Sequence, residues 1–468
     1  MKNKIDMKRL VGFILGIVLL IIISLIPSQP PLGEKAMLAL GFLVMAITWM
    51  VSGALPDYVS IIAMSVGWIV TGCADMNIVY GTFSTNIWWL LLGALALGLA
   101  AAESGLLMRA ALYMMKMFPP TFKGQSIALV VIGLVMGPLI PSTAAKAAII
   151  GSVAKSISDA MGFKKFSKGS AGLFASFILG SMVLAPAFLS SSFVGYTCVG
   201  LLPEGYTDVN WTTWFLYALP WSIVTIILMT VAILRMYKPK EETTMTKEYV
   251  SDELKNLGTW KSKEKFTAIV MIFCLIFWMT ERQHGIPSGM VAMSGTVILM
   301  GLNVFDRTKF RSKIAWDSII FIGIIVGLAN VFKEVGINDM IRELLGPIIS
   351  PLMSNIWVFI PVYCLIFFLM RFIIASLVGA ITICSIVMVP IGLELGIHPF
   401  VIIFIAYTCA HGWFTPYQNS IYITGQVATG DEMASHKQAI PYAVAYMVVT
   451  IIGNMVAIPW WKMLGLLP

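Results

Sequence analysis

The stretch GPLIPSTAAKAAII, at residues 137–150, holds side chains that could bind a charged ligand. The apolar runs on either side of it are each shorter than the roughly 20 residues that a membrane-crossing helix needs. We therefore expect a hairpin that enters a membrane and turns back. A cation and helix-breaking backbone are tolerated at membrane depth only where they face protein or water. We predict that Ser142, Thr143 and Lys146 at this tip bind an anion.

Polar residues interrupt three later apolar stretches and give further candidates for the same site. Proline breaks a helix because it lacks an N–H and clashes with the preceding turn. The candidates are Ser190, Ser191 and Ser192 after Pro186, Ser376 at a second tip, and Thr415 and Asn419 around Pro416. His411 is a candidate for proton coupling because histidine titrates in the physiological range. The alternative for His411 is a buried, hydrogen-bonded structural role.

The composition indicates a polytopic helical membrane protein. Of the 468 residues 59% are hydrophobic and 12% are charged, and the mean hydropathy is +0.89. The net charge of +8 comes from basic loops that report topology, so we expect no nucleic-acid partner. The six cysteines are isolated and form no CxxC. We expect them to be reduced, with no metal site and no cofactor.

The order of apolar segments predicts an all-α protein of about 11 transmembrane helices plus two re-entrant hairpins. The basic N-terminus is expected in the cytoplasm. The predicted parts are an N-terminal helix (1–35), a first repeat (36–235) with an inner hairpin (125–160) and a broken helix (169–202), a cytoplasmic linker (236–265), and a second repeat (266–468) with an outer hairpin (355–394) and a broken helix (398–427).

The two halves match in order and spacing. Glu103 pairs with Glu334 at a shift of 231 residues, and Ser142 pairs with Ser376 at a shift of 234. Pro186 and Pro416 are 230 residues apart. With one hairpin entering from each side, the pattern predicts an inverted-topology repeat. Such repeats place a transporter's binding site where the broken elements meet, and the half-helix N-termini there favour anions.

These motifs resemble those of the divalent anion/sodium symporter (DASS) family of the ion-transporter superfamily. Residues 141–146, PSTAAK, are similar to the P-S-N-T-A-R of its citrate, tartrate and oxoglutarate/malate exchanger branch. Residues 375–379, ASLVG, are similar to that branch's A-S-x-T-A, and residues 415–419, TPYQN, resemble the family's T-P-P-N. The family plan, with inverted hairpins and a broken helix after each, covers nearly the whole chain.

The resemblance implies a homodimer and, in sodium-coupled members, a sodium site near the two tips, which here would lie near Ser142 and Ser376. In those members each tip carries an S-N-T motif. Here Thr143 stands in the place of the first Asn, and the second tip has neither Asn nor Thr. Hard cations require several oxygen ligands. The sequence therefore favours carboxylate exchange or proton coupling over sodium symport.

We expect a secondary transporter, in the cell membrane, for a small di- or tricarboxylate such as succinate, malate, oxoglutarate or citrate. One alternative is a carrier of an inorganic oxyanion such as sulfate. A second alternative, a membrane-embedded enzyme, has little support. The sequence contains no HExxH, no paired intramembrane aspartates and no serine with suitable histidine and acid partners.

Overall fold

The computed structural model describes residues 7–28, 32–241, 244–246, 248–374 and 376–468. Helices are the only regular elements in these ranges, apart from one isolated β-bridge between Thr121 and Thr244. The all-α prediction is confirmed. The chain is so apolar that most of its backbone has to satisfy its own hydrogen bonds, which helices do locally.

The first half, up to the linker, is built from helices of very different length. Its α-helices are α1 (Met7–Ser24), α2 (Ala36–Ser52), α3 (Asp57–Val70), α4 (Met76–Tyr80), α5 (Asn86–Ser104), α6 (Leu106–Lys116), α7 (Phe122–Met136), α8 (Thr143–Ala160), α9 (Lys168–Ile178), α10 (Phe193–Gly200) and α11 (Trp211–Met236).

The linker contains one short helix, and the second half follows a similar order. These α-helices are α12 (Tyr249–Asn256), α13 (Ser262–Met279), α14 (Glu281–His284), α15 (Ser288–Gly301), α16 (Arg307–Lys313), α17 (Trp316–Ile325), α18 (Leu328–Glu334), α19 (Ile337–Met353), α20 (Ile356–Met370), α21 (Leu377–Glu394), α22 (Pro399–Ala410), α23 (Ser420–Ala428) and α24 (His436–Met463).

Among the described residues, seven helices are long and apolar enough to cross a membrane. The number is eight if α19 and α20, which meet at a bend of 119°, form one span. Several other apolar helices, such as α2, α3 and α15, have 10–17 residues. The predicted number of crossings, about eleven, stays a prediction.

Each expected hairpin corresponds to two helices joined by a short turn. The first consists of α7 and α8, and the second of α20 and α21. Each expected broken helix is also interrupted. After α9 the helix continues through a π-helical stretch at Leu179–Val183 and a 3₁₀ turn at Ala185–Ala187, and it breaks between Phe188 and Ser192 before α10 begins. After α22 it passes through a turn at Pro416–Gln418 before α23 begins.

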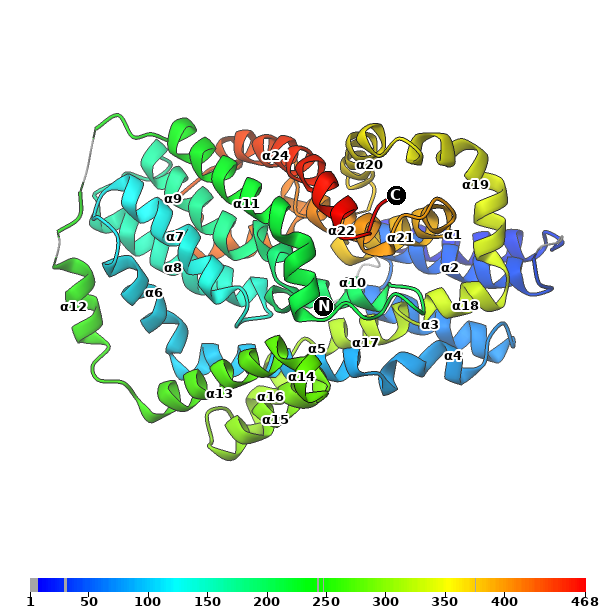
Figure 1. Ribbon diagram of the computed structural model, residues 1–468, viewed down its shortest axis with the longest axis horizontal. Coiled ribbons are helices and arrows are strands. Elements are labelled where there is room, and N and C mark those ends of the chain that lie inside the picture. Colours follow the sequence, from blue (N-terminus) through cyan, green and yellow to red (C-terminus); the bar gives the residue numbers. More distant parts are fainter. Residues whose placement is uncertain (1–6, 29–31, 242–243, 247, 375) are drawn as a thin grey trace.

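The packing joins elements that are far apart in the sequence. Helix α11 lies beside α24, α5 packs on α15, and α8 of the first hairpin packs on α23 of the second broken helix. In Figure 1, α6 to α9 and α12 lie toward one end of the long axis, and α1 to α4, α18 and α19 toward the other. The backbones of α7 and the first broken helix touch at Gly133 and Gly180, where a Cβ on Gly133 would lie 2.1 Å from the Gly180 carbonyl carbon.

A buried ion pair fixes the end of the linker to α6. Arg109 and Glu264 are both buried, with 3.0 Å between Nε and Oε2. Arg109 Nη1 donates to the Gly258 carbonyl at 2.9 Å, and Nη2 donates to the Thr259 carbonyl at 3.2 Å. The guanidinium also lies 5.4 Å from the ring centroid of Trp260. Arg109 thus pairs with the buried Glu264 carboxylate and donates hydrogen bonds to two linker carbonyls.

We expect Arg109→Ala to lower the melting temperature of the detergent-solubilised protein and to speed tryptic cleavage of the linker. Removing one partner of a buried ion pair leaves an uncompensated charge, at a cost of about 3–5 kcal/mol. Lys255→Ala is the control, because its pair with Asp252 is exposed and such pairs contribute little. Equal melting temperatures for the wild type and Arg109→Ala would contradict the prediction.

The foot of the first hairpin is held to the loop before α24 by charge. Lys155 Nζ lies 3.3 Å from Glu432 Oε2, and Lys165 also pairs with Glu432. The Phe166 N–H donates to the Glu432 carbonyl at 3.0 Å. Hydrogen bonds from Lys165, and then from Lys155, hold the pKa of the Glu432 carboxyl below its usual value of 4.5. Since the folded state favours the ionised carboxylate, the contact stabilises the fold above that value.

This contact predicts a pH-dependent effect of Glu432→Gln. Its stabilisation is fully present above pH 4.5 and is lost as the pH falls through the depressed pKa of the folded state. We expect a small fall in melting temperature for the variant at pH 7, and a smaller difference from the wild type at pH 3.5, where the stabilisation is already declining. Tryptophan fluorescence during heating measures the melting temperatures. A difference between variant and wild type that is the same at both pH values would refute a stabilising role for the ionised Glu432.

Candidate anion-binding site

Both hairpin tips and both broken helices meet at one cavity of about 500 Å³, which we call the central cavity. Helices α3 and α17 close its opposite side. Its polar lining residues come from five segments and are Asp57, Tyr58, Ser142, Thr143, Asp317, Ser318, Ser376, Tyr417, Gln418, Asn419 and Ser420. Its volume lies in the range of small-molecule sites.

The two tips have the same local structure. Ser142 caps α8, and its Oγ accepts a hydrogen bond from Ala145 N at 3.2 Å. Ser376 caps α21 in the same way, with Gly379 N at 3.2 Å. Serine is a favoured N-cap because its oxygen satisfies one of the free N–H groups at a helix start. The neighbouring motif residue Ala375 lies outside the described residues.

The two broken helices restart at polar caps of the same kind. Ser192 Oγ accepts a hydrogen bond from Val194 N at 3.2 Å, at the start of α10. Asn419 Oδ1 accepts from Ile421 N and Tyr422 N, both at 3.1 Å, at the start of α23. Four helices, α8, α10, α21 and α23, therefore begin at the edge of the central cavity. Their positive dipole ends and free N–H groups favour a bound anion.

Lys146 lies behind the cavity wall and does not line it. Its side chain is buried, and Nζ donates to the Ser191 carbonyl at 2.8 Å and to Ser191 Oγ at 2.6 Å. No carboxylate among the described residues lies within 4.0 Å of Nζ. The lysine therefore ties the first tip to the first break and adds positive charge close to the anion-favouring helix ends. Direct contact with substrate stays a prediction.

Arg371 has a comparable place in the second half. It is buried, and its guanidinium donates to the Ile374 carbonyl at 2.9 Å and to the Gln418 carbonyl. Tyr417 Oη donates to the Phe372 carbonyl at 3.1 Å. The hydrogen bonds from Arg371 to Gln418 and from Tyr417 to Phe372 join the second tip to the second break. Each hairpin is thus held to the broken helix of its own half by a buried cation that binds backbone carbonyls.

The remaining predicted residues surround the cavity without lining it. Ser190 Oγ donates to the Pro138 carbonyl at 2.7 Å and accepts from Trp211 Nε1 at 2.9 Å. The Thr415 N–H donates to Gln418 Oε1 at 2.9 Å. His411 is fully buried, and neither ring nitrogen has a hydrogen-bond partner among the described residues. These three residues, with Ser191 and Ser192, stay predicted site residues.

The sequence reasoning missed two carboxylates of the central cavity. Asp57 is the first residue of α3, and Asp317 lies in the first turn of α17. Neither residue was singled out from the sequence. A signal was available, because each precedes an apolar segment that lines up with an element of the other half. Of the uncharged lining residues, Tyr417 lies in the TPYQN motif, whereas Tyr58 and Ser318 belong to no motif.

Comparisons with known proteins give relatives of low identity. The Bacillus subtilis (strain 168) protein YflS, provisionally named a malate transporter, is 25% identical over 70% of this chain and 70% of its own length. The citrate/succinate antiporter of Escherichia coli (strain K12) is 27% identical over 55% of this chain and 54% of its own length. Dicarboxylate transporter 2.1, chloroplastic, of Arabidopsis thaliana is 26% identical over 58% of this chain and 49% of its own length.

Two solved transporter structures share the fold over almost the full chain. The Alcanivorax borkumensis YdaH transporter has a TM-score of 0.56 at 14% identity, covering 98% of both chains. Neisseria gonorrhoeae MtrF has a TM-score of 0.57 at 14% identity, covering 97% of this chain and 95% of its own. At this identity the likeness concerns the fold alone. The model of the family described as the sodium:sulfate symporter transmembrane region matches residues 7–467. The resemblance that the tip motifs suggested is confirmed, and this chain belongs to that family.

Proposed function

We propose that this protein is a secondary transporter that carries a small di- or tricarboxylate across the cell membrane by alternating access. The observation that carries the proposal is the meeting of four capped helix N-termini at one cavity of suitable size. The names of the relatives, which give malate, citrate, succinate and dicarboxylates, support the substrate class.

In this proposal the substrate carboxylates bind between the tips. Ser142, Thr143, Ser376 and Asn419 contact them, together with the N–H groups at the helix starts. Lys146 acts through Ser191 as a positioning group and as a source of positive potential. Ser190, Ser192 and Thr415 shape the wall formed by the two breaks. His411 is the candidate for proton coupling inside the moving part.

The architecture in this proposal is an inverted repeat, 36–235 against 266–468, with the linker 236–265 and the N-terminus in the cytoplasm. The hairpins and broken helices move together against the remaining helices, and two copies form a homodimer. The matched helix order of the two halves supports the repeat, and the DASS resemblance supports the dimer. An inorganic oxyanion such as sulfate is the second candidate, because the family description names sulfate.

Uptake of labelled succinate into proteoliposomes tests the function. The vesicles contain unlabelled succinate or buffer, each with and without an inward sodium gradient. We expect uptake that is inhibited by malate and citrate but not by sulfate. Uptake only into succinate-loaded vesicles would identify exchange, and sodium-driven uptake into empty vesicles would identify symport. Uptake of labelled sulfate in place of succinate would contradict the carboxylate proposal.

We expect Lys146→Met to weaken succinate binding by about tenfold, or about 1.4 kcal/mol, because it removes the positive potential of the lysine and the contacts that hold Ser191. Ser191→Ala should weaken binding less, and the double variant should resemble Lys146→Met if the two residues act as a unit. Lys164→Met, which changes an exposed lysine just beyond the foot of the same hairpin, is the matched control. Calorimetric titration measures the affinities, and wild-type affinity in Lys146→Met would exclude the role.

A further inference from the structure

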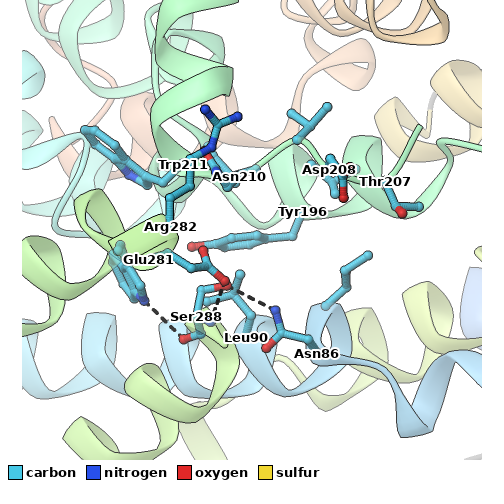
Figure 2. Close-up of a pocket in the computed structure, with 15 residues that line it drawn as sticks. Asn86, Leu90, Tyr196, Thr207, Asp208, Asn210, Trp211, Glu281, Arg282 and Ser288 are labelled. Atoms are coloured by element: carbon cyan, nitrogen blue, oxygen red, sulfur yellow. Dashed lines mark hydrogen bonds between the residues drawn. The ribbon is translucent and has the colours of Figure 1, made fainter. Parts of the chain in front are cut away.

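A second cavity, of about 360 Å³ and shown in Figure 2, lies where three helices begin and a fourth ends. Its lining includes Asn86 and Trp211, at the starts of α5 and α11, and Ser288 at the start of α15. Trp278, in the last turn of α13, also lines it. Apolar membrane helices end at the depth of the lipid headgroups, where tryptophan is enriched. The second cavity therefore lies at headgroup depth.

The charged side chains of the second cavity have both signs. Glu281 and Arg282 come from α14, and Asp208 comes from the loop before α11. Among the described residues none of these three side chains has an ion-pair partner within 4.0 Å, and no lysine or histidine lines the cavity. Two carboxylates against one arginine repel a dicarboxylate. The second cavity is therefore unsuited to the proposed substrate and suits a ligand that carries both charges.

A buried hydroxyl in the second cavity has no protein partner. Tyr196 lines the cavity from α10 and is 2% exposed, and its Oη makes no hydrogen bond within the described part of the chain. Figure 2 shows its ring extending from α10 toward Glu281, whereas the Arg282 side chain extends toward Asn210 at the start of α11. Buried polar groups nearly always have a hydrogen-bond partner. The occupant of the cavity therefore has to supply one.

A lipid-facing surface reaches the edge of the second cavity. One face of α13 carries large apolar side chains that are each at least half exposed, namely Ile269, Ile272, Phe273, Ile276 and Met279. In a membrane protein such a face lies against acyl chains. The Met279 carbonyl accepts a hydrogen bond from Thr212 Oγ1 at 3.2 Å, so this face meets the start of α11 beside the cavity. A molecule whose chains lie on α13 can thus place its polar end in the cavity.

We propose that the second cavity binds the headgroup of a zwitterionic aminophospholipid, phosphatidylethanolamine. Arg282 contacts the phosphate, because guanidinium and phosphate match in charge and geometry. The ammonium group donates to the Glu281 carboxylate and to the Tyr196 hydroxyl, and Asp208 adds negative potential. Glu281 is already held in place, since its Oε1 accepts from Ser288 N at 3.1 Å. Phosphatidylcholine has no N–H to donate, and phosphatidylglycerol has no cation, so the site selects against both.

Native mass spectrometry of the delipidated full-length protein in detergent tests this proposal. Phosphatidylethanolamine, phosphatidylcholine and phosphatidylglycerol with the same acyl chains are titrated separately. We expect one phosphatidylethanolamine to bind at least about tenfold more tightly than either other lipid. Tyr196→Phe and Arg282→Gln should each weaken its binding at least about threefold. The matched controls, Tyr206→Phe and Arg307→Gln, change a tyrosine and an exposed arginine outside the cavity and should bind as the wild type does.

Equal affinities for the three lipids in the wild type, or wild-type affinity for phosphatidylethanolamine in either cavity variant, would overturn the proposal. Displacement of the lipid by equimolar glycerophosphoethanolamine, which has the headgroup without acyl chains, would assign the cavity to a soluble zwitterion and would overturn it too. Melting temperatures without lipid show that each variant is folded. Phosphatidylethanolamine should raise the melting temperature of the wild type and controls more than that of the cavity variants, because a ligand of the folded state stabilises it. These measurements use no carboxylate substrate, so they do not depend on the proposed function.

Discussion

A helix that ends inside a membrane leaves backbone groups without partners, and each must be satisfied by protein or water. The structure around the central cavity follows from this constraint. At the helix starts, Ser142, Ser192, Ser376 and Asn419 supply oxygen acceptors to free N–H groups. In the turns that precede them, buried cations and hydroxyls donate to free carbonyls. The polar residues in these apolar stretches are first of all the partners that allow the helices to break.

The same contacts also affect the electrostatic potential at the central cavity. A carbonyl satisfied by a neutral donor would add no net charge, but the Ser191 and Gln418 carbonyls are satisfied by Lys146 and Arg371. Each cation is buried within the protein and close to a helix start, so its field is little screened by water. The requirement for backbone partners and the requirement for an anion-attracting potential are thus met by one set of contacts. Lys146 has this place next to the first break although it does not line the cavity.

Much of this organisation could be predicted from the sequence, because it depends on local patterns. The turn at Gly137–Ser142 and the break at Pro186 follow from residues that end helices, and the helices lie where these residues place them. The partner of Lys146 could not be predicted, since Ser191 is 45 residues away and adjoins two other candidate serines. Asp57 and Asp317 were not singled out, because only the fold shows which helix starts face the tips. The number of spans is also beyond hydropathy alone, as the 119° bend between α19 and α20 illustrates.

Helix α10 contributes to the walls of two cavities, the central cavity and a second one of about 360 Å³. Val194 lines the central cavity, whereas Tyr196 and Val199, on the other side of the same helix, line the second one. One helix, about 10 Å in diameter, therefore borders both spaces. Its start is joined to the first tip by the hydrogen bond from Phe193 N to the Pro141 carbonyl at 3.1 Å. The first hairpin is thus hydrogen-bonded to the start of α10. A tilt of that hairpin would therefore tilt α10 as well and change the volumes of both cavities.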